Sequence, residues 1–332
     1  MAVRRGQKLK LLYILDILKK QSDEEHPLNA IIICDELSKL GVSAERKAIY
    51  DDIEQLTDYG FDIIKTRLPK TGYFLASREF ETPEIYLLAD AVRTAKFITP
   101  KKSRELVSKL QNMLSVYQTA GIESGIYIDS DSKCNNEEIF YNIDTISRAI
   151  KEKKKIVFKY GVRELQKDRQ IKTVYRERKI SPYAQTWQDD HYYLIGNYEK
   201  YDNLAHFRID RIRAVEITEE NARPFSEVSG YTDVFDVADY TKRLFNMYGG
   251  KDEEIDFVCQ KELLEQVADR FGDKIFIRNV TDTHFSFTAN AVVSEAFITF
   301  VMNYGDKIEV KKPQYVREMI KKRAEKILDI YK

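Results

Sequence analysis

Hydrophobic residues recur at helical spacing near the start of the chain and alternate every second residue after position 60. Helices are predicted over residues 8–20 and 28–40, and Gly41 suits the left-handed end of the second. A third helix is predicted from an N-cap at Ser43 to Gly60, with an inward stripe of Ala48, Ile49, Ile53 and Leu56. A strand, a turn and a returning strand then follow over residues 61–77, which predicts a β-hairpin after the three helices.

The pattern changes several times after the hairpin. Amphipathic helices are expected over residues 79–143, and a helix beginning near Asn142 leads into a strand at 155–161. A charged hairpin or loop follows, then two strands joined at residues 188–190 and further strands over 204–217. The remainder reads as strand, helix, strand, helix, strand and helix. These changes predict an α+β multidomain chain with boundaries at 1–78, 79–145, 146–222 and 223–332.

Composition fits a soluble globular protein. Of 332 residues, 43% are hydrophobic, enough for several cores, yet no apolar run approaches the roughly 18 residues of a membrane span. The N-terminus also lacks the pattern of a signal peptide. We therefore expect a cytoplasmic protein with no membrane partner.

The charges balance overall, with 54 Lys plus Arg against 54 Asp plus Glu, but they are unevenly distributed. Residues 148–179 hold thirteen basic and four acidic side chains, whereas residues 1–80 hold thirteen of each. A local basic excess of this size attracts anionic partners.

Residues for catalysis do not gather in the sequence. Four histidines (His26, His191, His206 and His284) and three cysteines are scattered without metal-ligand or disulfide spacing. No glycine-rich phosphate loop or nucleophile elbow occurs. We expect no catalytic residue, no metal site, no cofactor and no enzymatic activity.

The first segment resembles the winged helix-turn-helix of bacterial DeoR-type regulators. The stretches "ERKAIYDDIEQLTDYGFDI" and "KTGYFL" carry the resemblance. It implies that the third helix enters the DNA major groove by its N-terminal part and that the hairpin wing also contacts the duplex. The implied DNA-binding residues are Ser43, Arg46, Lys47, Tyr50, Lys65, Arg67 and Lys70. The sequence departs from the family at Asp51, where a basic residue is common and a carboxylate repels phosphate.

The middle of the chain resembles the WYL domain, a small Sm-like β-barrel of bacterial regulators. Three ordered stretches carry the resemblance: "ISPYAQTW", "DDHYYLIGNY" and "HFRIDRI". Tyr192 stands where the naming triplet has Trp. The segment after residue 222 resembles the small α/β extension that often follows this domain. The resemblances together imply a winged helix-turn-helix, a helical linker or dimerisation region, a WYL domain and the extension.

The WYL resemblance also implies a ligand-binding face. Its residues here are Ser181, Tyr183, Tyr193, Arg208 and Arg211. Guanidinium groups pair with phosphate oxygens and tyrosine rings stack on bases, so a nucleotide or a single-stranded nucleic acid suits this set. Two alternatives stay open: an arginine can form an ion pair with Asp210, and the tyrosines can be core aromatics.

The sequence as a whole predicts a homodimeric transcriptional regulator that binds a double-stranded DNA operator and responds to a nucleotide or single-stranded nucleic acid effector. The alternative is a nucleic-acid-binding accessory factor that modulates a partner, such as a defence nuclease. Asp51 and the balanced charge of the first segment favour this alternative slightly.

Overall fold

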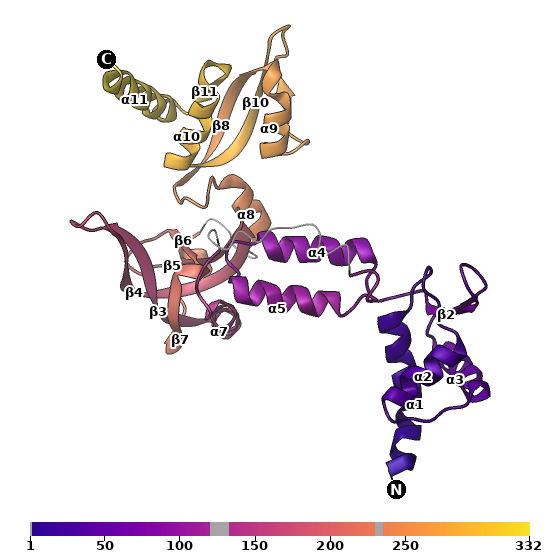
Figure 1. Cartoon of the computed structure of the whole chain (residues 1–332). Helices are drawn as coiled ribbons and strands as arrows, with labels where there is room; N and C mark the ends of the chain where they lie inside the picture. The colour runs from indigo at the N-terminus through magenta and orange to yellow at the C-terminus, as the bar shows by residue number, and fades with distance from the viewer. Residues whose placement is uncertain (1, 120–132, 230–234) are drawn as a thin grey trace. The chain divides into compact units, whose positions relative to one another are not determined.

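The computed structural model describes residues 2–119, 133–229 and 235–332 (Figure 1). The chain divides into two compact units, residues 1–135 and 136–332. Residues 120–132, part of the expected helical segment, lie outside the described residues.

Unit 1 begins with the predicted three helices and hairpin, which we call the head. Its elements are α1 (Ala2–Gln21), α2 (Ala30–Lys39), α3 (Arg46–Tyr59), β1 (Ile63–Thr66) and β2 (Gly72–Leu75). The inward stripes of the three helices meet in one core that includes the fully buried Leu18, Ile33, Leu37 and Ile49. The predicted inward stripe of α3 is confirmed for Ile49, Ile53 and Leu56, whereas Ala48 is only partly buried.

The start of α3 differs from the prediction. The N-cap is Glu45, in an extended conformation and without a side-chain cap bond, so Ser43 does not cap the helix. Ser43 lies two residues before this cap, in the irregular segment after α2. Gly60 ends the helix as predicted, because its φ of 119° lies in the left-handed region that glycine tolerates.

The hairpin is anchored to the rest of the head by backbone hydrogen bonds. The amide of Leu28 donates to the Tyr73 carbonyl, and the Tyr73 amide donates to the Leu28 carbonyl, each at 2.8 Å. A Cβ added to Gly72 would lie 2.8 Å from backbone carbons of Pro27 and Leu28. Glycine at position 72 therefore allows the hairpin to lie directly against the chain before α2.

Two antiparallel-packed helices complete the regular structure of unit 1: α4 (Thr82–Thr94) and α5 (Pro100–Gln111). Arg78, between β2 and α4, joins them to the head. Its guanidinium donates to the carbonyls of Lys19 at 2.7 Å and Ser22 at 2.8 Å, at the end of α1, and to Met113 at 3.4 Å, just after α5. A cation at a helix C-terminus also complements the helix dipole.

Unit 2 opens with α7 (Ile139–Glu152) and a five-stranded antiparallel sheet in the order β6-β5-β4-β3-β7. The strands are β3 (Lys154–Leu165), β4 (Ile171–Gln188), β5 (His191–Asn197), β6 (Leu204–Arg208) and β7 (Ile212–Asn221). In the part of the chain that the structure describes, β6 and β7 are the edge strands, so the sheet is open and the expected closed barrel is not found.

One face of this sheet packs on α7. Ile146 and Ala149 of the helix and Phe158 and Phe207 of the sheet are all buried, with the two phenyl rings 5.5 Å apart. On β6, Phe207 is buried, whereas His206 and Arg208 are only partly buried. Of the two alternatives expected after residue 161, a charged hairpin or a loop, the structure contains the hairpin, because β3 and β4 stay in register to Leu165 and Ile171.

The C-terminal part of unit 2 follows the predicted alternation. It contains α8 (Val237–Arg243), β8 (Lys251–Gln260), α9 (Leu264–Phe271), β9 (Ile277–Arg278), β10 (His284–Val293), α10 (Glu295–Asn303), β11 (Ile308–Lys312) and α11 (Gln314–Ile330). Its four strands form an antiparallel sheet in the order β11-β8-β10-β9 over a phenylalanine-rich core. Among the described residues, no helix is long and apolar enough to cross a membrane.

Candidate nucleic-acid interface and ligand-binding face

The first turn of α3 presents the predicted basic residues to solvent. Arg46 is the first residue of the helix, and Arg46, Lys47 and Tyr50 are all exposed while Ile49 is fully buried. Four backbone amides at a helix N-terminus lack partners within the helix, and the helix dipole is positive there. This turn therefore combines two cationic side chains with a favourable end for a phosphate.

The hairpin adds a third cation beside this turn. Lys65 of β1 places its ammonium 5.9 Å from the ring centre of Tyr50 and 5.6 Å from that of Tyr73. Arg67 and Lys70 are exposed near the hairpin turn. Tyr50 therefore links α3 and the hairpin, and we call Arg46, Lys47, Tyr50 and Lys65 the head surface.

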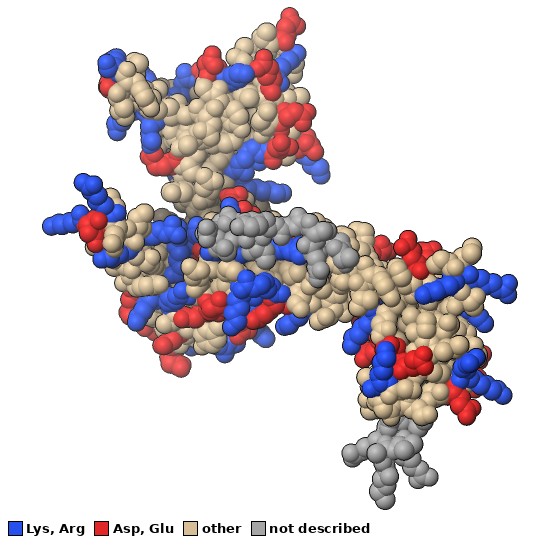
Figure 2. Space-filling model, viewed as in Figure 1, with Lys and Arg blue, Asp and Glu red and all other residues tan. Residues whose placement is uncertain are grey.

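Farther along α3 the exposed residues are acidic. Asp51, Glu54 and Asp58 all face solvent. Asp52, by contrast, is buried and pairs with Lys10 of α1 at 2.7 Å. Only the first turn of α3 is thus suited to approach a polyanion, and Figure 2 shows blue and red side chains interspersed on the visible part of the head.

Tyr193 and Arg208 lie together on the face of the unit 2 sheet opposite α7. This face is partly covered, because Tyr183 and Tyr193 both pack against a buried core cluster that includes Ile195, so the open alternative of core aromatics also holds for these tyrosines. Tyr193 and Arg208 are cross-strand partners on β5 and β6, and the Arg208 amide donates to the Tyr160 hydroxyl at 3.3 Å. The Arg208 guanidinium donates twice to Asp210, at 2.7 and 3.1 Å. Burial lowers the pKa of Arg208, but the bonds and charge of Asp210 outweigh burial and raise it. The open alternative of an Arg208–Asp210 ion pair is what the structure contains.

Arg211 lies three residues farther on, in the short 3-10 turn Ile209–Arg211. It is partly exposed and has no ion-pair partner among the described residues. Burial raises the pKa of Tyr193 above its ordinary value, so that hydroxyl stays neutral near pH 7. Tyr160, Tyr193 and Arg208 form what we call the tyrosine–arginine cluster, and Arg211 follows Arg208 by three residues along the chain.

Ser181 and Tyr183 have a different environment. Ser181 is 1% exposed, and its hydroxyl accepts a hydrogen bond from the Arg223 amide at 2.9 Å. The Tyr183 hydroxyl donates to the Arg223 carbonyl at 2.9 Å, and its ring packs on Phe225. Burial raises the pKa of Tyr183 to about 12. These two residues hold the chain after β7. A cavity of about 450 Å³ lies beside β6, and none of the five predicted ligand residues lines it.

Sequence reasoning missed a set of residues that fix the turn carrying Arg211. The buried Asn136 side chain donates to the carbonyls of Asp210 at 3.0 Å and Ile212 at 2.7 Å, and the buried Asn142 donates to Ile212 at 2.9 Å. The Glu138 carboxylate accepts from the Ala214 amide. The start of α7 therefore holds the turn, but no spacing in the sequence connects asparagines near 140 with carbonyls near 211.

Comparisons with known proteins identify two domains in unit 2. The model of the WYL domain matches residues 141–217, and the model of the WCX domain matches residues 251–328. The chain thus contains a WYL domain, as its sequence predicts, followed by a WCX domain. No curated protein matches the chain.

Two solved structures are similar over most of the sequence but at low identity. Proteasome accessory factor B/C (PafBC) of Arthrobacter aurescens is 15% identical, with a TM-score of 0.28, over 94% of this chain and 47% of that chain. This chain therefore spans about half the length of the PafBC chain. A CRISPR Cas-related protein is 13% identical, with a TM-score of 0.36, over 100% of this chain and 86% of that chain.

Proposed function

We propose that this protein is a transcriptional regulator that binds an operator duplex through a winged helix-turn-helix at residues 1–78 and responds to a ligand of its WYL domain. It carries out no catalysis in this proposal, and it acts in the cytoplasm as a homodimer. The ligand class is a nucleotide or a single-stranded nucleic acid.

The head surface is the observation that carries the proposal. Arg46 and Lys47 extend from the exposed first turn of α3, and Lys65 of the hairpin lies beside Tyr50 of the same helix. Helix-turn-helix proteins contact base edges with the N-terminal residues of the recognition helix, and wings contact the sugar–phosphate backbone. The acidic remainder of α3 restricts the approach of DNA to this first turn.

The tyrosine–arginine cluster supports the ligand response. A phosphate group would compete with Asp210 for the Arg208 guanidinium, while Arg211 offers a second guanidinium three residues away. The turn between them is held by Asn136 and Asn142 at the start of α7, so a ligand that moves this turn also acts on the segment entering the WYL domain. In this proposal, the contact is the first step by which a ligand affects operator binding.

The experiment selects bound fragments from sheared genomic DNA of the source organism with the full chain. The proposal predicts enrichment of one sequence motif, loss of enrichment in Arg46→Ala/Lys47→Ala, and retention in the matched control Lys20→Ala/Lys39→Ala. Equal enrichment by both double variants would contradict the assigned surface. Mass spectrometry of nucleotides that co-purify with wild type and with Arg208→Ala then tests the ligand face, where loss of a captured nucleotide in the variant is expected.

A second function is favoured by one observation, the exposed Asp51, Glu54 and Asp58 of α3. With these residues turned toward a partner protein, the head would serve protein contact, and the chain would modulate a nucleic-acid enzyme such as a defence nuclease. This alternative predicts duplex binding that hardly changes with salt, because the head makes no phosphate contacts.

A further inference from the structure

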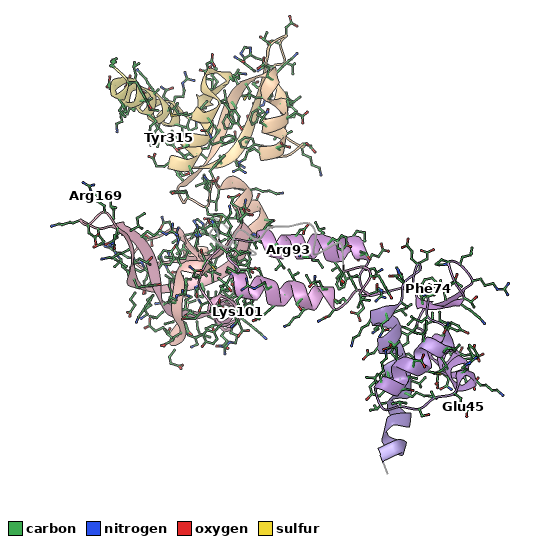
Figure 3. The ribbon with its side chains drawn as sticks, in the orientation of Figure 1. Glu45, Phe74, Arg93, Lys101, Arg169 and Tyr315 are labelled. Atoms are coloured by element: carbon green, nitrogen blue, oxygen red, sulfur yellow. The ribbon has the colours of Figure 1, made fainter. Side chains whose placement is uncertain are left out.

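A two-stranded arm extends from the WYL sheet, and neither the tyrosine–arginine cluster nor the head surface includes it. The last rung between β3 and β7 joins Tyr160 and Ile212. Beyond it β3 pairs only with β4, over the five rungs from Gly161–Tyr175 to Leu165–Ile171. Five residues of strand are about 17 Å long. Figure 1 shows the arm extending past the other strands, and Figure 3 labels Arg169 at its end.

The turn of the arm is ordered by its own hydrogen bonds. The Gln166 amide donates to the Gln170 carbonyl at 2.9 Å, and the Asp168 carboxylate accepts from the Gln170 amide at 3.1 Å. Arg169 has a φ of 64° and donates its amide to the Gln166 carbonyl. This turn leaves the side chains of Lys167 and Arg169 exposed at the tip.

The arm exposes apolar side chains that a solvated hairpin has no need to carry. Leu165 is 76% exposed, Ile171 is 71% exposed, and the two are directly opposite on one face. Tyr175 is 48% exposed on the same face, and its ring lies across Gly161, where an added Cβ would be 3.3 Å from the ring. An isolated two-stranded ribbon is marginally stable in water, so exposed apolar residues at its end indicate a partner.

Charge identifies the class of partner. Residues 159–179 contain eight Lys or Arg and three Asp or Glu. Two of the three acids are already neutralised within the arm, Glu164 by Arg176 and Asp168 by Lys172. Arg163, Lys167 and Arg169 form no ion pair among the described residues, and Figure 2 shows blue side chains around the tip. The partner is therefore a polyanion.

We propose that this β3–β4 arm enters a groove of duplex DNA. Cations lie at the tip and along the sides of the arm. This distribution fits a duplex groove with phosphates on both walls better than a single nucleic-acid strand that contacts only one face of the arm. The major groove of B-DNA, about 12 Å wide, admits a two-stranded ribbon, whereas that of duplex RNA is too narrow for side chains to read. Leu165 and Ile171 then contact base edges, while Arg163, Lys167 and Arg169 contact phosphates.

The proposal is tested by the affinity of the full chain for a 30-base-pair DNA duplex of random sequence. Fluorescence anisotropy measures this affinity at several salt concentrations. Arg163→Ala/Lys167→Ala/Arg169→Ala should reduce the slope of log affinity against log salt by about 2.7, which is 0.9 for each lost phosphate contact. The control Lys274→Ala/Lys322→Ala/Lys326→Ala, three exposed lysines outside the arm, should keep the wild-type slope. Arg163→Lys/Arg169→Lys keeps the charge and should retain binding, which separates a charge effect from misfolding.

Further measurements distinguish the partners. Leu165→Ser/Ile171→Ser should weaken duplex DNA binding at an unchanged salt slope. The proposal would be overturned if the protein bound single-stranded DNA or duplex RNA as tightly as duplex DNA or more tightly. It would also be overturned if Leu165→Ser/Ile171→Ser lost self-association while its DNA binding stayed unchanged.

The arm extends the proposed function but can fail separately from it. If the arm proposal is wrong, the arm variants should bind duplex DNA as tightly as wild type. If the proposed role of the head is wrong, Arg46→Ala/Lys47→Ala should bind as tightly as wild type.

Discussion

Replacing Asn136 with Ala tests how the turn that carries Arg211 is held. The substitution removes the donor to the Asp210 carbonyl and one of two side-chain donors to the Ile212 carbonyl. Asn136 is only 1% exposed, so water does not readily replace these bonds. A buried polar group left without its partner costs about 1 to 3 kcal/mol, and we expect a loss of about 2 kcal/mol in the local stability of the turn.

Hydrogen exchange followed by mass spectrometry measures this loss directly. A decrease of about 2 kcal/mol corresponds to about 30-fold faster exchange where local opening governs the rate. The increase should appear in peptides that cover residues 205–216 and the start of α7. Asn303→Ala, which removes an exposed asparagine at the end of α10, is the matched control and should leave these peptides unchanged.

Protection of residues 205–216 that stays within threefold of wild type would refute the reasoning. It would mean that the turn is stable without the start of α7 and that the proposed route from ligand to operator binding lacks its first contact.

Three further predictions concern other points of the fold. Arg78→Met removes three carbonyl contacts and should speed exchange at the end of α1 at least tenfold, whereas the exposed control Arg104→Met should not. Gly72→Ala places a Cβ against the backbone of Pro27 and Leu28, which cannot move away, so the free energy of unfolding of the head, measured in urea, should fall by at least about 2 kcal/mol. A fall of less than about 0.5 kcal/mol would contradict the close approach. Burial lowers the pKa of His206 to about 4, so below pH 6.5 the unfolded chain binds a proton that the folded chain does not. The free energy of unfolding should therefore fall by about 2 kcal/mol between pH 7 and pH 5, more than in His206→Gln; equal falls would contradict this.

The order of elements could be predicted because the apolar faces decide it. The stripe of α3 specifies one buried face, and the structure buries Ile49, Ile53 and Leu56 on it. The end of α3 at Gly60 could also be predicted, because a helix often ends at a residue in the left-handed conformation and glycine tolerates that conformation. The start of α3 was not, because Ser43 is a good N-cap by type while the backbone turns only at Glu45.

The chemistry of the candidate sites depended on contacts between distant segments. Ser181 is typical of a polar ligand contact, yet the Arg223 amide, 42 residues away, uses its hydroxyl. Asn136 and Asn142 are typical of a loop and a helix start, and their buried carbonyl partners lie about 70 residues later. The charged stretch after residue 161 left a hairpin and a loop open because its apolar residues are few, and the structure continues the β3–β4 register into a hairpin that leaves Leu165 and Ile171 exposed.

The salt dependence of duplex binding by wild type and by Arg46→Ala/Lys47→Ala tests the central claim most directly, with an enriched genomic fragment as the probe. If the first turn of α3 contacts the operator, the wild-type affinity should fall steeply with salt, and the double variant should lose affinity together with up to about 1.8 of the log–log slope. A duplex affinity that is nearly independent of salt, or equal in the two proteins, would contradict operator binding by the head.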